Sequence, residues 1–389
     1  MSRLNELIQS ICPNGIEYKK LKDVLSIERG KRVVKKQLSE VHGYPVYQNS
    51  LTPLGLYVEY NCPENTAFVI MAGAAGEIGY SRERFWAADD CFAIVCPSSI
   101  CSKYIYHVLL NEQMVLKRNV RKASIPRLSR DTLECLKIPL PPLAVQQEIV
   151  RILDSFTELT AELTAELTAR RKQYEHYRDE LLTFDGSVKR MALKDVCIKV
   201  QDGNYGKEYP SKSELLKSGV PLINGKAIHG TICKEALDFI SEEKNEELKK
   251  ARIATDDVLF LNRGNIGETA YVPSEFDNCN IGPQVTLLRA NKSKILPKYL
   301  EFALHSKDVR NFISRVGGGT IKFLSVEPIR QLEIPVPPLA IQKQIVSVLA
   351  RFDTLCNDLT SGLPAEIAAR QKQYEYYRDK LLTFKELER

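Results

Sequence analysis

One long segment occurs twice in the sequence, and this duplication constrains the fold more than any other feature. The first copy runs from Ile138 to Phe184 and the second from Ile334 to Phe384. Both open with a proline-rich run, I-P-L-P-P-L-A or I-P-V-P-P-L-A, and both close with K-Q-Y-E-x-Y-R-D-x-L-L-T-F. Matches of this length indicate an internal repeat, so we expect a molecule built from two similar halves.

Each copy predicts a long helix that follows a proline-rich stop. The prolines end the preceding strand, and apolar residues then recur at steps of three and four. This spacing lays one stripe along a helix and suits packing against a second helix. In the first copy the stripe is Ile149, Leu153, Phe156, Leu163, Leu167, Tyr174, Tyr177, Leu181 and Phe184.

The middle of the second helix is expected to kink or break. The offset between the copies grows from 196 residues at their heads to 200 at their tails, so the second copy has extra residues, which a coiled coil absorbs as a stutter. Gly362 and Pro364 stand at this point, and both disfavour a helix interior. The first copy instead carries T-A-E-L in tandem, at Thr160–Leu163 and Thr164–Leu167.

A globular part precedes each helix, and the two parts are diverged versions of each other. Leu21–Val24 matches Leu193–Val196, and Gly73–Glu77 matches Gly264–Glu268. Runs rich in β-branched residues predict strands at 67–71, 92–95, 258–261 and 285–288, and helices are predicted at 104–116, 241–251 and 298–306. We predict an α+β fold with mixed α/β domains at 1–143 and 185–339 and helices at 144–184 and 340–389.

If the two helices pack antiparallel as a coiled coil, the molecule has a pseudo-twofold axis with one domain at each end. The 39 residues from Gln146 to Phe184 would span on the order of 58 Å as a helix. This is roughly one and a half turns of B-DNA, at about 34–36 Å per turn. Two different readers held apart in this way would read a split, asymmetric DNA target.

Composition sets few limits of its own. The chain has 389 residues and a net charge of +6, a mild basic bias that fits a polyanionic partner only weakly. No apolar run is long enough to span a membrane and no leader pattern follows Met1, so we expect a cytoplasmic protein without a membrane partner. The ten cysteines lack paired spacing and are expected to be free thiols.

The sequence predicts neither a catalytic site nor a metal site. It has no Asp/Asn-Pro-Pro-aromatic loop, as an adenine methyltransferase would need, and no Pro-Asp dipeptide to begin the usual nuclease metal motif. Cysteines and histidines form no metal-binding pattern, and no nucleotide site is evident. Any chemistry must therefore lie on partners.

The duplicated motifs resemble those of one known family, the specificity subunits of type I restriction–modification enzymes. The resemblance rests on I-P-[LV]-P-P-L-A-x-Q with Gln146 and Gln342, on the duplicated K-Q-Y-E-x-Y-R-D-x-L-L-T-F, and on the T-A-E-L tandem. It implies a non-catalytic subunit with two target recognition domains that bind double-stranded DNA. It also implies two modification subunits, which methylate adenine with S-adenosylmethionine, and restriction subunits that join through the complex. S-adenosylmethionine, ATP and Mg are expected on those partners, and no cofactor on this chain.

Candidate DNA contacts are basic, amide and aromatic residues in predicted loops, because Arg and Lys serve phosphates and guanine while Asn and Gln serve adenine. The alternative for each is a solvated surface residue. Arg263 is the strongest candidate, since it follows an apolar strand in a glycine loop. The first domain offers Lys31, Arg32, Lys35, Lys36, Gln48, Asn49, Arg82, Arg84, Arg121, Lys122 and Arg127. The second offers Asn204, Tyr205, Lys207, Asn224, Lys226, Asn262, Arg263, Asn265 and Lys322.

Candidate partner contacts lie on the duplicated helices, where both copies keep the same residue types. Near-identical copies favour two equivalent partners. The alternative for the tyrosines is packing within the helix pair. These candidates are Arg170, Arg171, Lys172, Tyr174, Tyr177, Lys372, Tyr374 and Tyr377.

Two other functions stay open at this point. The chain could be a protein scaffold whose domains bind no DNA, or a free-standing DNA-binding regulator. A scaffold would bind DNA weakly and without salt dependence, whereas a true reader loses affinity steeply as salt rises. A regulator would bind its site tightly without any partner.

Overall fold

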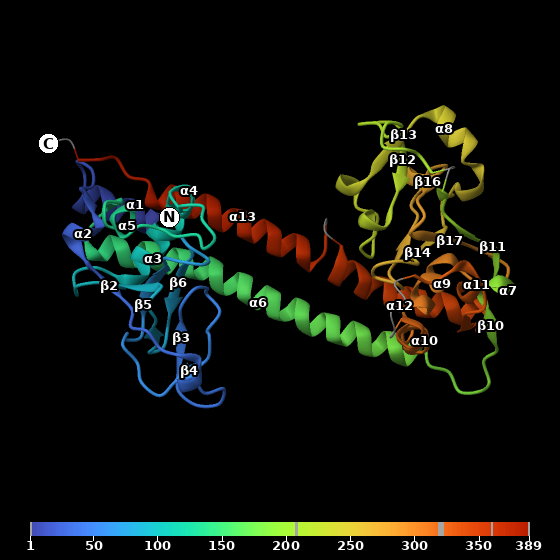
Figure 1. Cartoon of the computed structure of the whole chain (residues 1–389), viewed down its shortest axis with the longest axis horizontal. Coiled ribbons are helices and arrows are strands. Elements are labelled where there is room, and N and C mark those ends of the chain that lie inside the picture. The colour runs from blue at the N-terminus through green and yellow to red at the C-terminus, as the bar shows by residue number, and fades with distance from the viewer. Residues whose placement is uncertain (1, 207–208, 318–322, 359–360, 388–389) are drawn as a thin grey trace. The chain divides into compact units, whose positions relative to one another are not determined.

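The computed structural model describes residues 2–206, 209–317, 323–358 and 361–387. The chain divides into two compact units: unit 1 comprises Met1–Glu162 and Ile367–Arg389, and unit 2 comprises Leu163–Glu366. Helix α6 (Leu143–Leu181) gives its first half to unit 1 and its second half to unit 2. Each unit therefore contains one globular domain and a pair of helix segments (Figure 1). None of the described helices is long and apolar enough to cross a membrane.

The domain of unit 1 is built on three small sheets. A four-stranded antiparallel sheet has the order β2-β8-β5-β6, with β5 buried along its whole length. A three-stranded sheet has the order β4-β3-β7, and β1 pairs with β9. The strands are β1 (Tyr18–Lys20), β2 (Ser26–Arg29), β3 (Tyr44–Tyr47), β4 (Leu56–Tyr57), β5 (Thr66–Ile70), β6 (Ile78–Ser81), β7 (Trp86–Ala87), β8 (Cys91–Val95) and β9 (Lys137–Pro139).

Helices of unit 1 cover the main sheet and share its apolar core with the helix pair. That core joins Leu109 of α3 to Ile149 of α6 and Leu381 of α13. The helices are α1 (Ser2–Ile11), α2 (Leu21–Val24), η1 (Lys35–Gln37), α3 (Ser102–Asn111), α4 (Gln113–Arg118), α5 (Arg130–Glu134), the first half of α6, and most of α13 (Leu363–Leu382).

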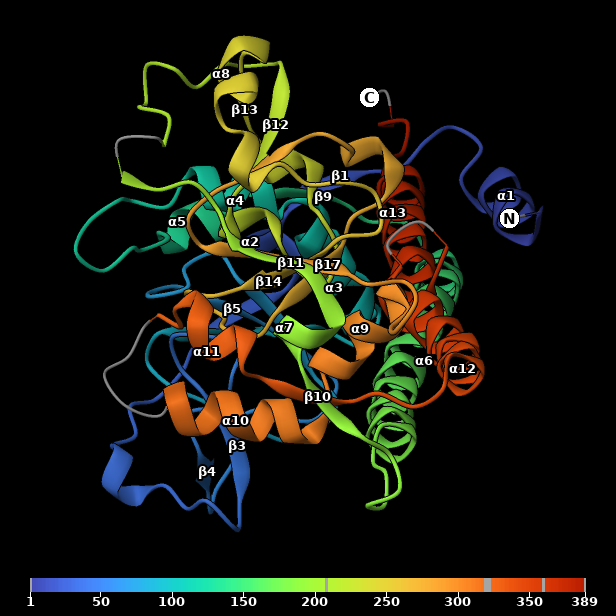
Figure 2. The same ribbon diagram turned by 90° about the vertical axis from the view of Figure 1, so that its right-hand side faces the viewer.

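Unit 2 repeats the same three sheets. Their orders are β11-β17-β14-β15, β13-β12-β16 and β10-β18, and β11 and β17 run side by side in Figure 2. The strands are β10 (Arg190–Ala192), β11 (Cys197–Asp202), β12 (Val220–Ile223), β13 (Asp238–Ile240), β14 (Val258–Leu261), β15 (Thr269–Tyr271), β16 (Asn280–Ile281), β17 (Val285–Ala290) and β18 (Glu333–Pro335).

The helices of unit 2 follow the same plan with more short turns. They are α7 (Leu193–Val196), η3 (Gly225–Ala227), η4 (Lys234–Ala236), α8 (Glu242–Glu247), η5 (Lys249–Ala251), η6 (Ser274–Phe276), α9 (Pro297–Leu304), α10 (Lys307–Gly317), α11 (Val326–Arg330) and α12 (Leu339–Asn357).

The predicted internal repeat is confirmed strand by strand. Each strand of unit 1 has a counterpart in unit 2 with the same neighbours, including one parallel pair, β3 with β7 and β12 with β16. The proline-rich motif has the same role in both units. Gln146 accepts the Cys101 N–H (2.8 Å) and donates to the Pro141 carbonyl (2.7 Å). Gln342 makes the equivalent two bonds at 2.8 and 2.8 Å.

Within each unit the paired helix segments run antiparallel. In unit 1 Phe156 of α6 stacks on Tyr377 of α13, with ring centroids 5.3 Å apart, and earlier residues of α6 pack near the end of α13. In unit 2 Tyr174 of α6 stacks on Phe352 of α12 at 6.3 Å. The predicted apolar stripe thus packs two helices together in both units.

The break expected in the second helix is also confirmed, because α12 ends at Asn357 and α13 begins at Leu363. A Cβ atom on Gly362 would lie 2.5 Å from the Thr354 carbonyl oxygen, so the chain passes itself closely at this point.

Two predicted helices are wrong in detail. The one predicted at 104–116 consists of α3 and α4, which meet at Glu112, where the backbone leaves the helical conformation. The one predicted at 241–251 is the short α8 followed by η5, because Leu248 turns the chain into the core. The predicted strands are present as β5, β8, β14 and β17.

Candidate nucleic-acid interface

In unit 1, loops that follow three strands meet the loop between β7 and β8; we call this the strand-end cluster. The Gly30 N–H, just after β2, donates to the Cys91 carbonyl (3.0 Å). The Ala74 N–H, just after β5, donates to the Asn49 carbonyl after β3 (2.9 Å). A Cβ atom on Gly30 would lie 2.1 Å from the Ala88 carbonyl oxygen, so only glycine allows this approach.

Unit 2 has an equivalent strand-end cluster in which two backbone bonds of unit 1 recur, with Gly203 in the place of Gly30 and Gly282 in the place of Ala88, whose N–H donates to the Tyr47 carbonyl (2.9 Å). The Gly203 N–H, just after β11, donates to the Val285 carbonyl (2.9 Å), and the Gly282 N–H donates to the Ile223 carbonyl (3.0 Å). A Cβ atom on Gly203 would lie 2.0 Å from the Gly282 carbonyl oxygen. Two loops that begin far apart in the chain are therefore fixed at one edge of each domain, as binding loops on a rigid frame usually are.

Several predicted DNA contacts gather on these clusters with exposed side chains. In unit 1, Arg127 forms β-bridges with both Arg121 and Ala72, so two exposed arginines lie next to the loop after β5. In unit 2, Arg263 bridges to Phe323, and its guanidinium lies 5.1 Å above the Phe323 ring. The exposed candidates at or next to the clusters are Lys31, Asn49, Arg121, Lys122, Arg127, Tyr205, Lys226, Arg263 and Asn265.

Some of these side chains also have protein partners. The Lys226 ammonium is 2.8 Å from Asp238, and the Asn265 amide donates to Glu268 (3.3 Å). Gln48 is half-buried and donates to Asp89 (3.3 Å). DNA would have to compete for these groups, so they are weaker candidates than Arg127 and Arg263.

The prediction that Asn204, Asn224 and Asn262 contact DNA is corrected by their burial, at 3%, 9% and 0% exposure. Asn262 donates to both Asp202 (3.3 Å) and Thr286 (3.1 Å). Asn204 and Asn224 likewise bond inside the domain. Their amides tie strand ends together, because buried polar groups in such turns need partners.

Arg82 and Arg84 lie apart from the clusters. Thr66 pairs with Ser81, so Arg82 and Arg84 follow the end of β6 that is opposite the loop after β5. Arg84 lies over the Tyr60 ring at 4.8 Å. The exposed Arg32, Lys35 and Lys36 lie in the segment that joins β2 to β3. Lys207 and Lys322 fall outside the described residues.

Sequence reasoning missed Phe323, an aromatic residue that is 38% exposed beside Arg263. Charges and amides mark candidate contacts in a sequence more readily than a single phenylalanine, and Phe323 lies far from Arg263 along the chain. An exposed ring beneath a guanidinium offers a flat apolar surface next to a cation, which suits a nucleic-acid partner.

On the helices, the structure favours packing over partner contact for most of the predicted tyrosines. The Tyr374 hydroxyl is 3.2 Å from His107 Nδ1, and burial raises the pKa of Tyr374 to about 12. Tyr174 and Tyr377 stack on phenylalanines, while Tyr177 keeps 37% exposure. Arg170 is half-buried and lies 3.5 Å from Glu166; Arg171, Lys172 and Lys372 are exposed.

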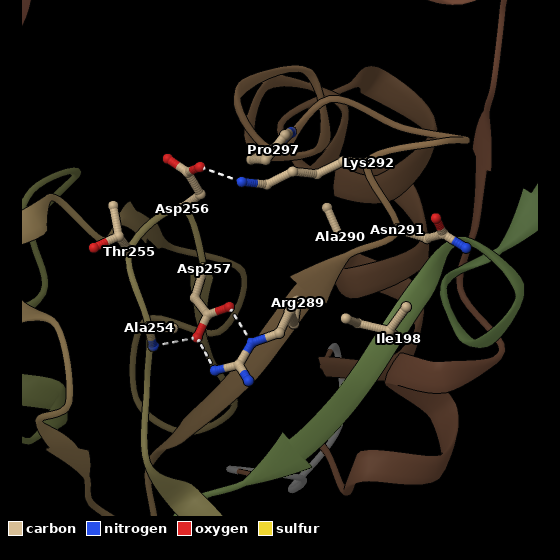
Figure 3. Close-up of a pocket in the computed structure, with 10 residues that line it drawn as sticks. All are labelled: Ile198, Ala254, Thr255, Asp256, Asp257, Arg289, Ala290, Asn291, Lys292 and Pro297. Atoms are coloured by element: carbon tan, nitrogen blue, oxygen red, sulfur yellow. Dashed lines mark hydrogen bonds and ion pairs between the residues drawn. The ribbon is translucent and has the colours of Figure 1, made fainter.

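A cavity of about 360 Å³ opens at the end of the β11–β17 sheet opposite the strand-end cluster (Figure 3). Its charged lining is paired internally: Arg289 binds Asp257 through two bonds of 2.8 Å, and Lys292 lies 2.6 Å from Asp256. It does not join the candidate interface. Among the described residues no group of three or more metal-ligating side chains occurs, and all ten cysteines are free thiols.

The model of a protein family described as the type I restriction modification DNA specificity domain matches residues 13–170 and 186–369, once in each repeat. The chain belongs to this family. The sequence resemblance is thereby confirmed, and the family is one of DNA recognition rather than catalysis.

Two proteins that are similar in sequence to this chain are described as type I restriction enzyme specificity subunits. A Haemophilus influenzae protein assigned as a type I restriction enzyme specificity subunit is 32% identical, over 95% of this chain and 96% of its own length. The Escherichia coli EcoR124I/EcoR124II specificity subunit is 38% identical over 64% of this chain and 63% of its own length. The fold matches a type I restriction–modification S subunit from M. genitalium with a TM-score of 0.64 and 17% identity, covering 95% of this chain and 96% of that one.

Proposed function

We propose that this specificity subunit reads a bipartite, asymmetric DNA target, one half with each unit. The observation that carries the proposal is the pair of strand-end clusters, which share two backbone bonds and a close glycine contact but expose different side chains. The bridged pair at the equivalent place is Ala72 and Arg127 in unit 1 but Arg263 and Phe323 in unit 2, and the loop after the third strand exposes Asn49 in unit 1 and Lys226 in unit 2. Different side chains on one frame would read different base sequences.

The helices supply the second part of the proposal. Helix α6 is continuous over 39 residues, a length on the order of 58 Å. In the proposal, this length sets the spacer between the two half-sites. The exposed cations Arg171, Lys172 and Lys372, with the edge of Tyr177, contact two modification subunits, and restriction subunits join through them.

The chemistry in this proposal belongs to the partners. Modification subunits would bind S-adenosylmethionine and methylate one adenine in each half-site, and restriction subunits would use ATP and Mg. The specificity subunit would determine which DNA sequence is bound. Such a complex acts on chromosomal and incoming DNA, so we expect it in the cytoplasm.

Methylation mapping tests this function. The chain is co-expressed with its neighbouring modification subunit, and methylated adenines are located by single-molecule sequencing. The proposal predicts one split, asymmetric motif with one methylated adenine on each strand.

Other outcomes would favour the alternatives. A stable complex without methylation, with weak DNA binding that ignores salt, would indicate a scaffold. If the subunit alone bound DNA tightly and specifically, it would be a regulator, since partner subunits would then not be needed for DNA affinity or specificity.

A further inference from the structure

Arg263 and Phe323 form an exposed pair at the strand-end cluster of unit 2, and the donors of Arg263 have no ligand within the protein. The two residues share a β-bridge, and the guanidinium carbon lies 5.1 Å from the centre of the ring. The Arg263 side chain makes no hydrogen bond or ion pair with any residue in the described ranges. Its N–H groups are therefore available to a bound molecule.

The backbone on both sides of this pair is fixed. Arg263 directly follows Asn262, which is fully buried and whose amide donates to side chains on β11 and β17. Phe323 directly precedes Leu324, whose N–H donates to the Asn262 carbonyl (2.8 Å). The stacked guanidinium therefore stands on a rigid base, and it loses little conformational entropy when it binds a ligand.

A phosphate group is a poor ligand for this pair. The Phe323 ring is 38% exposed, and the negative face of an aromatic ring gains nothing from phosphate oxygens beside it. The same glycine loop carries Glu268, whose carboxylate accepts from the Asn265 amide (3.3 Å) and would repel a phosphate. The edge of a base in the major groove differs, because it presents neutral polar atoms and apolar groups side by side.

Guanine fits the pair better than the other bases do. Its N7 and O6 atoms both face the major groove as acceptors, and an arginine fork donates to both at once. Adenine offers one acceptor and one donor there, and a guanidinium, which only donates, would leave the adenine amino group unpaired. The Phe323 ring beneath the guanidinium would contact the C5-methyl group of a neighbouring thymine.

Unit 1 has a different arrangement at the equivalent place. Its bridge joins Ala72 to Arg127, so a cation stands where unit 2 has the ring and a methyl group stands where unit 2 has the guanidinium. Arg127 is accompanied by the exposed cations Arg121 and Lys122. A loop with several cations suits contact with phosphates, so Arg127 is the matched control for Arg263.

We propose that the half-site read by unit 2 contains a guanine next to a thymine. Arg263 donates to N7 and O6 of the guanine in the major groove, and Phe323 packs against the methyl group of the thymine. This inference rests on the proposed function and deepens it, because it names the bases that one unit recognises.

The first step of the test identifies the half-site of unit 2. Methylation mapping gives the whole motif. A chain in which residues 190–335 are replaced by residues 18–139 then shows which half depends on unit 2, because that half is lost. We expect the lost half to contain guanine and thymine as neighbours.

Base analogues then test the contact atom by atom in the complex with the modification subunit. 7-Deazaguanine lacks the N7 acceptor, whereas hypoxanthine keeps N7 and O6 and lacks only the amino group in the minor groove. We expect 7-deazaguanine to weaken binding about tenfold and hypoxanthine to change it little. Deoxyuridine in place of the thymidine removes only the C5-methyl group, and it should weaken binding by a smaller factor.

Three variants connect these losses to particular side chains. Arg263→Ala should weaken binding to the natural duplex, and 7-deazaguanine should then cost nothing further, because the contact is already absent. Phe323→Ala should likewise abolish the loss caused by deoxyuridine. Arg127→Ala, the control, should weaken binding but leave the effect of 7-deazaguanine in the half-site of unit 2 at its full size.

Three results would overturn the inference. These are a unit 2 half-site without a guanine beside a thymine, equal binding of the 7-deazaguanine and natural duplexes, and an undiminished effect of 7-deazaguanine in Arg263→Ala. The absence of any split motif is a different outcome: it would contradict the proposed function, and the inference would fall with it.

Discussion

Unit 1 and unit 2 have the same strand pairings but different surfaces. Gly30 and Gly203 hold the same close contact, and Gln146 and Gln342 make the same bonds between the proline-rich motif and a helix start. The exposed residues beside these positions are not kept. Backbone bonds and a few small or buried residues therefore maintain the frame, so the surface can change independently.

The largest expected effect comes from blocking the close contact in either unit. In Gly203→Ala or Gly30→Ala, the new Cβ would lie 2.0 or 2.1 Å from a backbone carbonyl oxygen. We expect a loss of about 3 kcal/mol in the free energy of unfolding, confined to the altered unit. Hydrogen exchange measured peptide by peptide would show which unit loses protection. Gly186→Ala is the control, because no atom lies within 4 Å of its Cβ. An equal loss of protection in both units would contradict the view that each unit is stabilised by its own close contact.

A smaller effect is expected from the two glutamines. Gln342→Leu leaves the Leu296 N–H and the Pro337 carbonyl without their partner, and Gln146→Leu does the same in unit 1. Unpaired buried groups of this kind cost about 2 kcal/mol. Thermal unfolding of both single variants should show similar destabilisation. A neutral result for one glutamine would show that the motif has different roles in the two units.

The next smaller effect is expected from replacing a residue that contacts DNA. Arg263→Ala should weaken DNA binding about tenfold and change base preference, since an arginine contact to a base is worth about 1–3 kcal/mol. Arg82→Ala serves as the control, because Arg82 lies at the opposite end of its sheet from the strand-end cluster. Binding is measured at several salt concentrations. An equal loss for both variants would mean that the clusters are not the reading surface.

The smallest effect distinguishes the two helix pairs. Tyr374 contacts His107 in unit 1, whereas the described part of unit 2 has Phe302 at the position equivalent to His107 and no hydrogen bond from the Tyr174 hydroxyl. Tyr374→Phe should therefore cost about 1 kcal/mol of unit 1 stability, and Tyr174→Phe almost nothing. Denaturant unfolding of the two variants compares them, and equal costs would argue against this asymmetry.

The sequence predicted the parts of the fold that repeat. The duplicated motifs predicted the helix pairs, and Gly362 with Pro364 predicted the break between α12 and α13. The end of a short helix such as α3 could not be predicted, since backbone geometry at Glu112 decides it. Periodicity marks apolar faces well and helix ends poorly.

The candidate site was harder to predict because it depends on which loops meet. Arg127 and Arg263 are predicted as basic residues in loops, Arg263 directly after an apolar strand, and the structure keeps both exposed. Asn262 has the same kind of loop position but is buried, because Asp202 and Thr286 approach it from other strands. Such partners are distant in sequence, as is Phe323 from Arg263, so residue type alone could not separate contacts from frame.

A graft of one domain into the place of the other tests whether each unit reads one half of the target independently. Residues 190–335 of unit 2 are replaced by residues 18–139 of unit 1, since Arg190 pairs with Pro335 as Tyr18 pairs with Pro139. The grafted chain is co-expressed with the modification subunit, and methylated adenines are mapped. If the units read independently, we expect the motif to become an inverted repeat of the half-site read by unit 1, methylated on both strands. A motif that stays asymmetric, or that loses the half-site of unit 1, would contradict it.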